Sequence, residues 1–258
     1  GTAALVPVGT TGESPTLSHD EHDLVVDLCI KQAAGRVPVI AGAGSNSTAE
    51  AVRLARHAAA AGASAVLIVS PYYNKPTQAG LYAHFAAVAE AVDVPVIVYD
   101  IPGRSVVRLN DNTLAKLASD YANISGIKDA TADLARPTIL HNMLGNTFTQ
   151  LSGEDATALP YLAAGGHGCI SVTANIAPKL LSDMHASWWA GDIAAAQSIH
   201  QKLLPVHEAM FCEASPGPVK YAASLLGICA DEVRLPLCKI ADSSKSQVND
   251  ALVGAGLL

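Results

Sequence analysis

Short apolar runs alternate with longer alanine-rich segments along most of this chain, at intervals of roughly 30 residues. The runs are apolar throughout rather than at every second position, which is typical of parallel strands covered on both faces. This alternation predicts an α/β fold whose strands are joined by right-handed crossovers. The predicted strands are Ala4–Val8, Val37–Ala41, Ala65–Ser70, Val94–Tyr99, Ile124–Lys128, Thr147–Ser152 and Cys169–Thr173.

The segments between these runs have the amphipathic pattern of helices and carry helix-end signals. Ser18 and Glu21 have the spacing of a capping box. Gly35, Gly62 and Gly145 stand where helices are expected to end. The predicted helices are Asp20–Ala34, Thr48–Ala61, Gln78–Ala91, Asn112–Ser119, Leu134–Leu144, Ala156–Ala163 and Lys179–Trp189.

Two architectures fit this pattern, an open doubly wound sheet and a closed barrel. The number of β–α units favours a (β/α)8 TIM barrel that lacks its first β–α unit. The alternation stops near Gly191, and Ile193–Cys212, Gly217–Leu226 and Ser246–Leu257 are predicted to be helices. We therefore expect a barrel domain over residues 1–190, holding strands 2 to 8 of the barrel, and a C-terminal helical appendage over residues 191–258.

The composition excludes several classes of protein. With 50% hydrophobic and 15% charged residues, the chain is not of the disordered class. A formal net charge of -7 without basic runs argues against a nucleic-acid partner. No apolar run reaches the ~18 residues of a membrane span. The five dispersed cysteines, without a C-x-x-C pair, suit the reducing cytoplasm.

The loops after the predicted strands hold the candidate reacting groups, as expected for a TIM barrel. Gly9–Glu13 combines glycines and threonines before a helix, which suits a carboxylate, although an ordinary glycine turn fits as well. The adjacent Tyr72 and Tyr73 fit either a site or an interface. Arg104, in a Gly/Pro loop, suits either a bidentate carboxylate contact or a surface salt bridge.

Lys128 closes the predicted strand Ile124–Lys128, and Tyr99 closes another. Burial lowers the pKa of an ammonium group, and the neutral amine is the form that attacks a ketone. The alternative is a lysine whose stem is buried and whose ammonium reaches water. The Tyr99 hydroxyl, at the end of a very apolar strand, requires a polar partner.

Motifs for cofactors and metals are weak. Gly42–Gly44 begins a dinucleotide loop, but Ser47 holds the place of its third glycine. His19 and His22 share a helix face without a third ligand. We therefore expect neither a metal nor a cofactor.

Together, these segments resemble the dihydrodipicolinate synthase family, within the wider group of pyruvate aldolases that includes N-acetylneuraminate lyase. The resemblance covers essentially the whole chain in order. The segments that carry it are Gly9–Glu13, Tyr72–Asn74, Tyr99–Arg104, Gly126–Asp129, Leu151–Asp155 and Gly165–Ser171.

The resemblance implies that Lys128 forms an imine with pyruvate. Tyr99 would relay protons together with Thr11 and with Tyr73 of a neighbouring subunit, which implies a homo-oligomer, expected to be a tetramer. The enamine would then attack aspartate semialdehyde, and the product would cyclise to 4-hydroxy-tetrahydrodipicolinate, in the first committed step of diaminopimelate and lysine biosynthesis.

The resemblance also implies the substrate contacts. Thr10 and Thr11 would hold the pyruvate carboxylate, and Arg104 the carboxylate of aspartate semialdehyde. Gly153 and Ile170 would line the pyruvate pocket.

Two other functions stay open, a sister class I aldolase acting on a sugar-derived 2-keto acid, and a catalytically inactive barrel that binds small acids. Paired threonines and Arg104 favour the synthase over the sister aldolase. Asp100 stands where the family usually has Asn, and Ser105 where it usually has Thr; we expect small effects from both.

A regulatory site is implied by residues that match the family's feedback-inhibition site for lysine. Glu50 would bind the ε-ammonium, and Asn46 and Tyr72 the polar backbone end. The alternative for the two histidines is a solvated helix face. The full set is Ser14, His19, His22, Asn46, Glu50 and Tyr72.

The chain begins within the apolar run Ala4–Val8, without a methionine or a signal peptide. The family has one more strand and helix, roughly 30 residues, before this point. We interpret the chain as a fragment, and we expect it to be poorly soluble or inactive when expressed alone, because the open barrel leaves unpaired strand edges.

Overall fold

The computed structural model describes residues 1–258 and divides them into two compact units. The sheet unit consists of residues 3–9 and 17–170, and the helical unit of residues 1–2, 10–16 and 171–258. The sequence predicts a domain boundary at residue 190, between α8 (Pro178–Trp189) and α9 (Ile193–Ala209). In the structure both helices belong to the helical unit, where they pack against each other.

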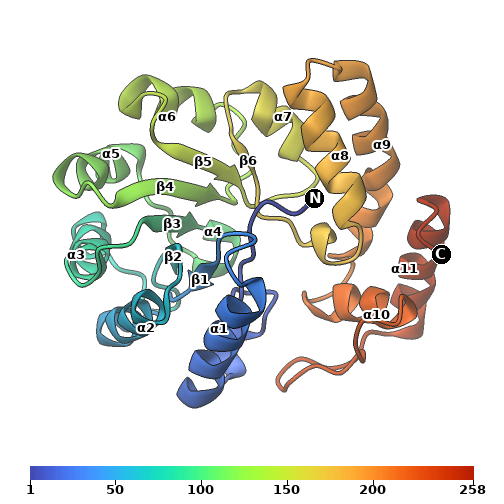
Figure 1. Cartoon of the computed structure of the whole chain (residues 1–258), viewed down its shortest axis with the longest axis horizontal. Helices are drawn as coiled ribbons and strands as arrows, with labels where there is room; N and C mark the ends of the chain where they lie inside the picture. Colours follow the sequence, from blue (N-terminus) through green and yellow to red (C-terminus); the bar gives the residue numbers. More distant parts are fainter. The chain divides into compact units, whose positions relative to one another are not determined.

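The sheet unit is built on six parallel strands that follow one another in sequence order. The sheet is curled like part of a barrel (Figure 1). The α/β class and the parallel strands predicted from the apolar runs are therefore confirmed. The strands are β1 (Ile40–Gly42), β2 (Ala65–Val69), β3 (Val96–Asp100), β4 (Ile124–Asp129), β5 (Thr149–Ser152) and β6 (Gly168–Cys169).

The first and last predicted strands are wrong in extent. Ala4–Val8 contributes only an isolated parallel bridge between Leu5 and Val39. Pro7 has no N–H to donate, and Val8 has a φ of 48°, outside the β region. The predicted strand Cys169–Thr173 ends at Cys169, because Ser171 Oγ accepts from Ala174 N at 2.8 Å in a turn that leads into the 3-10 helix Thr173–Asn175.

Helices cover the outer face of the sheet, where α2, α3, α5 and α6 follow one another (Figure 1). The capping box is confirmed, since Ser18 Oγ accepts from Glu21 N at 3.2 Å and Glu21 Oε2 accepts from Ser18 N at 2.8 Å. The one-turn helix α4 (Pro102–Ser105) had no sequence signal. The others are α1 (His19–Ala33), α2 (Thr48–Ala61), α3 (Gln78–Ala89), α5 (Asp111–Asp120), α6 (Arg136–Leu144) and α7 (Ala158–Ala163).

The central strands β2 and β3 bury side chains on both faces of the sheet. Val98 and Ile127 belong to the large core under the helices. Leu67, Ile97 and Tyr99 belong to a smaller cluster on the concave face. Because side chains alternate along a strand, Tyr99 lies on the concave face and its neighbour Asp100 on the outer face.

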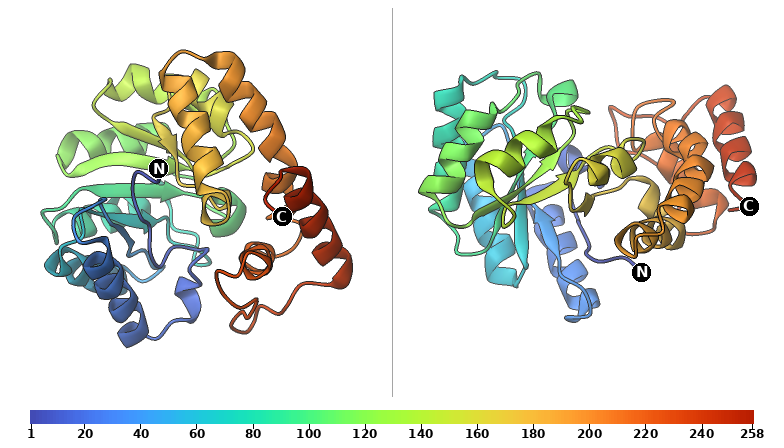
Figure 2. Two further views of the ribbon diagram at one scale, coloured as in Figure 1. Left: turned by 45° about the vertical axis from the view of Figure 1, so that its right-hand side comes forward. Right: turned by 90° about the horizontal axis from the view of Figure 1, so that it is seen from above.

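The helical unit packs α8 on α9, and α11 (Asp242–Gly254) on both α9 and α10 (Gly217–Leu225), as Figure 2 shows. The tail helices predicted after Gly191 are thus present. Met210, Val219 and Leu252 form part of its core. No helix in either unit is both long enough and apolar enough for a membrane span.

Glu13 fastens the segment 10–16 inside the helical unit. Its carboxylate accepts from Lys220 Nζ at 2.9 Å and from Arg234 N at 2.7 Å. Burial acts to raise the pKa of Glu13, but the hydrogen bonds and the positive charges of Lys220 and Arg234 outweigh burial, so that the pKa lies below its ordinary value. The ionised carboxylate therefore stabilises the folded state.

The contribution of Glu13 should vanish in acid. Its folded-state pKa is lowered, so its stabilisation is fully present above the unfolded value of about 4.3 and is lost as the pH falls through the folded value. We expect Glu13→Gln to unfold more easily than the wild type at pH 7 and equally easily near pH 3. Denaturant unfolding measures this difference. The exposed Glu232→Gln is the control, and an equal pH-dependent difference there would contradict the assignment.

Candidate functional site

Lys128 and Tyr99 lie side by side on the concave face of the sheet. The two residues are partners in the register of β3 on β4. Lys128 Nζ lies 4.1 Å from the centroid of the Tyr99 ring. Tyr99 is buried, Lys128 is half-buried, and the amine is not engaged in a salt bridge. The arrangement leaves a primary amine over the face of a tyrosine ring, with no carboxylate paired to it.

Gly153 and Ile170 complete the surroundings of this pair. A Cβ at position 153 would lie 3.1 Å from Lys128 Cε and 2.8 Å from Ala130 Cβ, so only glycine leaves the lysine stem its room. Ile170 packs on the concave-face cluster that contains Tyr99. The structure thus brings together four of the predicted site residues, Lys128, Tyr99, Gly153 and Ile170.

Arg104 and Tyr73 are exposed residues of the sheet unit. Arg104 lies in α4, directly after the end of β3, and its side chain is free to reach solvent. Tyr73 is 86% exposed and has a φ of 72°, in the left-handed region. Thr10 and Thr11 are half-buried in the helical unit, where Thr10 O accepts from Glu13 N at 3.1 Å.

The residues predicted to bind lysine are linked across three segments of the sheet unit. His19 Nε2 lies 2.5 Å from Glu50 Oε1, and the Ser45 hydroxyl also donates to Glu50. Asn74 binds the carbonyl oxygens of Asn46 and Tyr72, each at 2.9 Å. Glu50 thus connects the start of α1 with the loop after β1, and Asn74 connects that loop with the one after β2.

The pKa values of Glu50 and His22, two members of this group, are lowered for different reasons. The Ser45 hydroxyl and then His19 hold the pKa of Glu50 below its ordinary value. His22 is buried, and burial lowers its pKa although Asp23 lies 3.8 Å away. His22 is therefore not on a solvated helix face. Ser14 belongs to the helical unit, where it begins the 3-10 helix Ser14–Thr16.

A buried charge network stands behind the site and was not anticipated. Arg136 is 0% exposed, and its Nη1 lies 2.7 Å from Asp100 Oδ2 and 3.3 Å from Asp129 Oδ1. Its Nε lies 2.8 Å from Asp111 Oδ1. Burial raises the pKa of Asp100, and this effect outweighs the lowering by Arg136. Burial acts to lower the pKa of Arg136, but the three carboxylates outweigh it, so that the pKa of Arg136 lies above its ordinary value. The only available signal was that aspartates follow both Tyr99 and Lys128, at the ends of buried strands.

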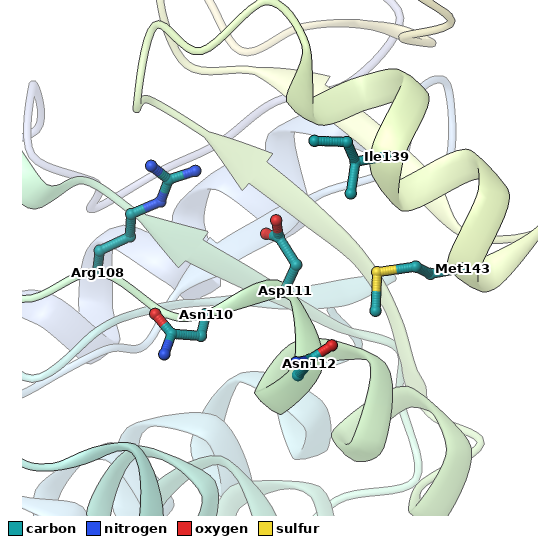
Figure 3. Close-up of a pocket in the computed structure, with 6 residues that line it drawn as sticks. All are labelled: Arg108, Asn110, Asp111, Asn112, Ile139 and Met143. Carbon is teal, nitrogen blue, oxygen red and sulfur yellow. The ribbon is translucent and has the colours of Figure 1, made fainter.

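A pocket of about 390 Å³ lies on the outer side of the sheet unit, between the start of α5 and α6 (Figure 3). None of the predicted site residues lines it. Asp111 is the one residue that it shares with the network of Arg136. Its lining residues are Arg108, Asn110, Asp111, Asn112, Ile139 and Met143.

No group of three or more His, Cys, Asp or Glu side chains has a spacing that would hold a metal ion. Cys169, at the end of β6, is half-buried, and desolvation raises the pKa of its thiol far above the ordinary value. The thiol is therefore protonated near neutral pH and is not a competing nucleophile.

Comparison with known proteins identifies the family of this chain. Residues 1–255 match the model of the dihydrodipicolinate synthetase family. A 4-hydroxy-tetrahydrodipicolinate synthase of Gluconacetobacter diazotrophicus is 58% identical over 259 residues, which cover 100% of this chain and 87% of that protein.

Solved structures agree in fold over the whole chain. A dihydrodipicolinate synthase of Acinetobacter baumannii, complexed with pyruvate, has a TM-score of 0.97 and 45% identity, and covers 100% of this chain and 88% of that one. The enzyme of Cyanidioschyzon merolae, solved with lysine bound, has a TM-score of 0.97 and 38% identity over the same shares of 100% and 88%. The chain belongs to the dihydrodipicolinate synthetase family.

Proposed function

We propose that this protein is a lyase that condenses pyruvate with L-aspartate 4-semialdehyde to give 4-hydroxy-tetrahydrodipicolinate, the first committed step of diaminopimelate and lysine biosynthesis. The observation that carries the proposal is the amine of Lys128 beside the Tyr99 ring, with no salt bridge to occupy it. Relatives of the same name, 58% identical over the whole chain, support it. We propose further that the curled sheet belongs to a closed (β/α)8 barrel.

The chemistry needs a nucleophilic amine and a proton relay. The neutral amine of Lys128 adds to the ketone of pyruvate, and loss of water leaves an imine. Loss of a methyl proton gives an enamine, which attacks the aldehyde carbon and forms the new carbon–carbon bond. Cyclisation of the product through its own amine releases the enzyme amine. The imine nitrogen serves as the electron sink, so no cofactor is required.

Each proposed residue has a role in these steps. The Tyr99 hydroxyl moves protons to and from the intermediate, in a relay with Thr11 and with Tyr73 of a neighbouring subunit. The exposure of Tyr73 in its own subunit, 86%, is what such a role needs. Gly153 leaves room beside the Lys128 stem, and Ile170 forms an apolar wall.

Two carboxylates have to be bound. We assign the pyruvate carboxylate to Thr10 and Thr11, whose hydroxyl and backbone N–H groups are suitable donors. We assign the carboxylate of aspartate semialdehyde to Arg104, because an exposed guanidinium after the end of β3 suits a bidentate contact. We also propose a homotetramer in the cytoplasm, a location that suits the five free cysteines.

Trapping of the imine tests the covalent step. We expect borohydride with pyruvate to add one reduced pyruvate to Lys128, detected by intact mass and peptide mapping, and we expect Lys128→Arg to abolish it. Lys116→Arg is the matched control, because Lys116 also lies over a tyrosine ring, 5.0 Å from the Tyr82 centroid, but pairs with Asp120 at 2.5 Å. Labelling at a different lysine, or at none, would refute the proposal.

Arg104 separates the synthase from a sister aldolase. Arg104→Ala should raise the KM for aspartate semialdehyde by on the order of tenfold to a hundredfold, as expected when a charged hydrogen bond is lost. Steady-state kinetics with the semialdehyde and with sugar-derived aldehydes measures the preference. Arg108→Ala, which removes an exposed ion pair to Asp133, is the control. A wild-type preference for the sugar aldehyde would assign the protein to the sister group.

Lysine is proposed to bind at the group around Glu50. Glu50→Gln removes the charge that faces the ε-ammonium, and we expect it to weaken lysine binding at least tenfold in isothermal titration. Glu90→Gln is the control, because Glu90 belongs to the same unit and accepts a hydrogen bond from the Tyr121 hydroxyl. This variant should bind lysine as the wild type does. Absence of wild-type binding at millimolar lysine would rule out this site.

A further inference from the structure

The two strands that carry Tyr99 and Lys128 end in a pair of facing carboxylates. The register of β3 on β4 aligns Tyr99 with Lys128 and, one residue further, Asp100 with Asp129. Both aspartates are buried, at 0% and 3% exposure, on the outer face of the sheet. Facing like charges in a dry environment repel each other, so this pair of carboxylates is unfavourable without a counter-charge.

Arg136, at the start of α6, supplies that counter-charge in a bridging position. A single nitrogen, Nη1, contacts the carboxylates of both strand ends, at 2.7 Å for Asp100 and 3.3 Å for Asp129. The Nη2 atom donates to Leu109 O at 2.8 Å. The guanidinium therefore joins β3, β4 and the segment before α5, and it is among the largest fully buried side chains of the protein.

The side chains of the two aspartates also bind backbone N–H groups, so that the position of the guanidinium restrains the backbone. Asp100 Oδ1 accepts from Leu109 N at 3.2 Å, and Asp129 Oδ1 accepts from Thr131 N at 2.9 Å. The two strand ends are also joined directly, because Ala130 N donates to Asp100 O at 2.9 Å. When both aspartates are held outward, the preceding residues of each strand must point inward, since side chains alternate along a strand.

We propose that Arg136 is a positioning residue for the covalent step: it clamps the ends of β3 and β4 from the outer face and thereby holds Tyr99 and Lys128 at reacting distance on the concave face. This inference rests on the proposed function. Arg136 touches no substrate. Its effect acts through the two aspartates that immediately follow the reacting residues.

Asp111 allows the positioning role of Arg136 to be distinguished from a general contribution of the buried charge network to stability. It binds the same guanidinium, at 2.8 Å from Nε, but it belongs to α5 and also lines the outer pocket (Figure 3). It is not part of either reacting strand. Loss of its charge should leave the clamp on β3 and β4 in place.

The test compares the rate of imine trapping in Arg136→Met and Arg136→Lys with the wild type. At saturating pyruvate, we expect the trapping rate of Arg136→Met to fall by on the order of a hundredfold, as for a reacting group misplaced by about 1 Å. Arg136→Lys keeps the charge but cannot span both strands and Leu109 O, so it should recover only part of the rate. The half-saturating pyruvate concentration should stay within about twofold, because Thr10 and Thr11 bind the carboxylate.

Two controls establish that the loss is specific. Asp111→Asn should trap at close to the wild-type rate. Arg53→Met removes another arginine pair of the sheet unit, with Asp23 at 2.9 Å, and should also trap normally. Circular dichroism and thermal unfolding of each variant report whether it is folded.

The outcomes are distinct. If Arg136→Met does not fold, Arg136→Lys decides, and a folded variant that traps at least tenfold more slowly supports the proposal. A folded Arg136 variant with the wild-type rate overturns it, and so does an equal loss in Arg53→Met. If the wild type itself forms no adduct on Lys128, the proposed function fails, and this inference fails with it.

Discussion

The register of β3 on β4 is the constraint on which the candidate site depends. It places Tyr99 beside Lys128 on one face and Asp100 beside Asp129 on the other. A slip of one residue would move each side chain to the opposite face of its strand, so that a lysine would be buried under the helices and an aspartate would enter the site. The register is therefore specified from both faces, by apolar packing on the concave face of the sheet and by a bridging guanidinium on the outer face.

Much of this fold could be predicted from sequence, because its elements are strongly patterned. The helix over Thr48–Ala61 agrees with the prediction at both ends, since Gly62 takes the left-handed conformation that closes it. The central strand Ala65–Val69 is an uninterrupted apolar run. Ala4–Val8 is equally apolar, yet Pro7 and the positive φ of Val8 limit it to a bridge. Apolar character predicts burial more reliably than it predicts hydrogen-bond pairing.

The place of Lys128 in the candidate site was predictable, because a lysine at the end of an apolar strand contradicts its surroundings. Arg136 gave no such signal, because in the sequence it lies in the first turn of an ordinary predicted helix, Leu134–Leu144. Its burial arises from tertiary pairing with Asp100, which lies 36 residues earlier in the chain. Asp100 was expected to have a small effect, but in the structure it is the closest carboxylate contact of the guanidinium.

The two faces of the same strands have opposite electrostatic tasks. The outer face gathers three carboxylates around one guanidinium, which neutralises only part of their charge. On the concave face, the amine meets an aromatic ring instead of a salt-bridge partner. A carboxylate paired with this amine would favour the protonated ammonium, which is not nucleophilic. For the proposed imine chemistry, keeping Asp100 and Asp129 turned outward is therefore a chemical requirement as well as a packing one, and the alternation of side chains along a strand satisfies both.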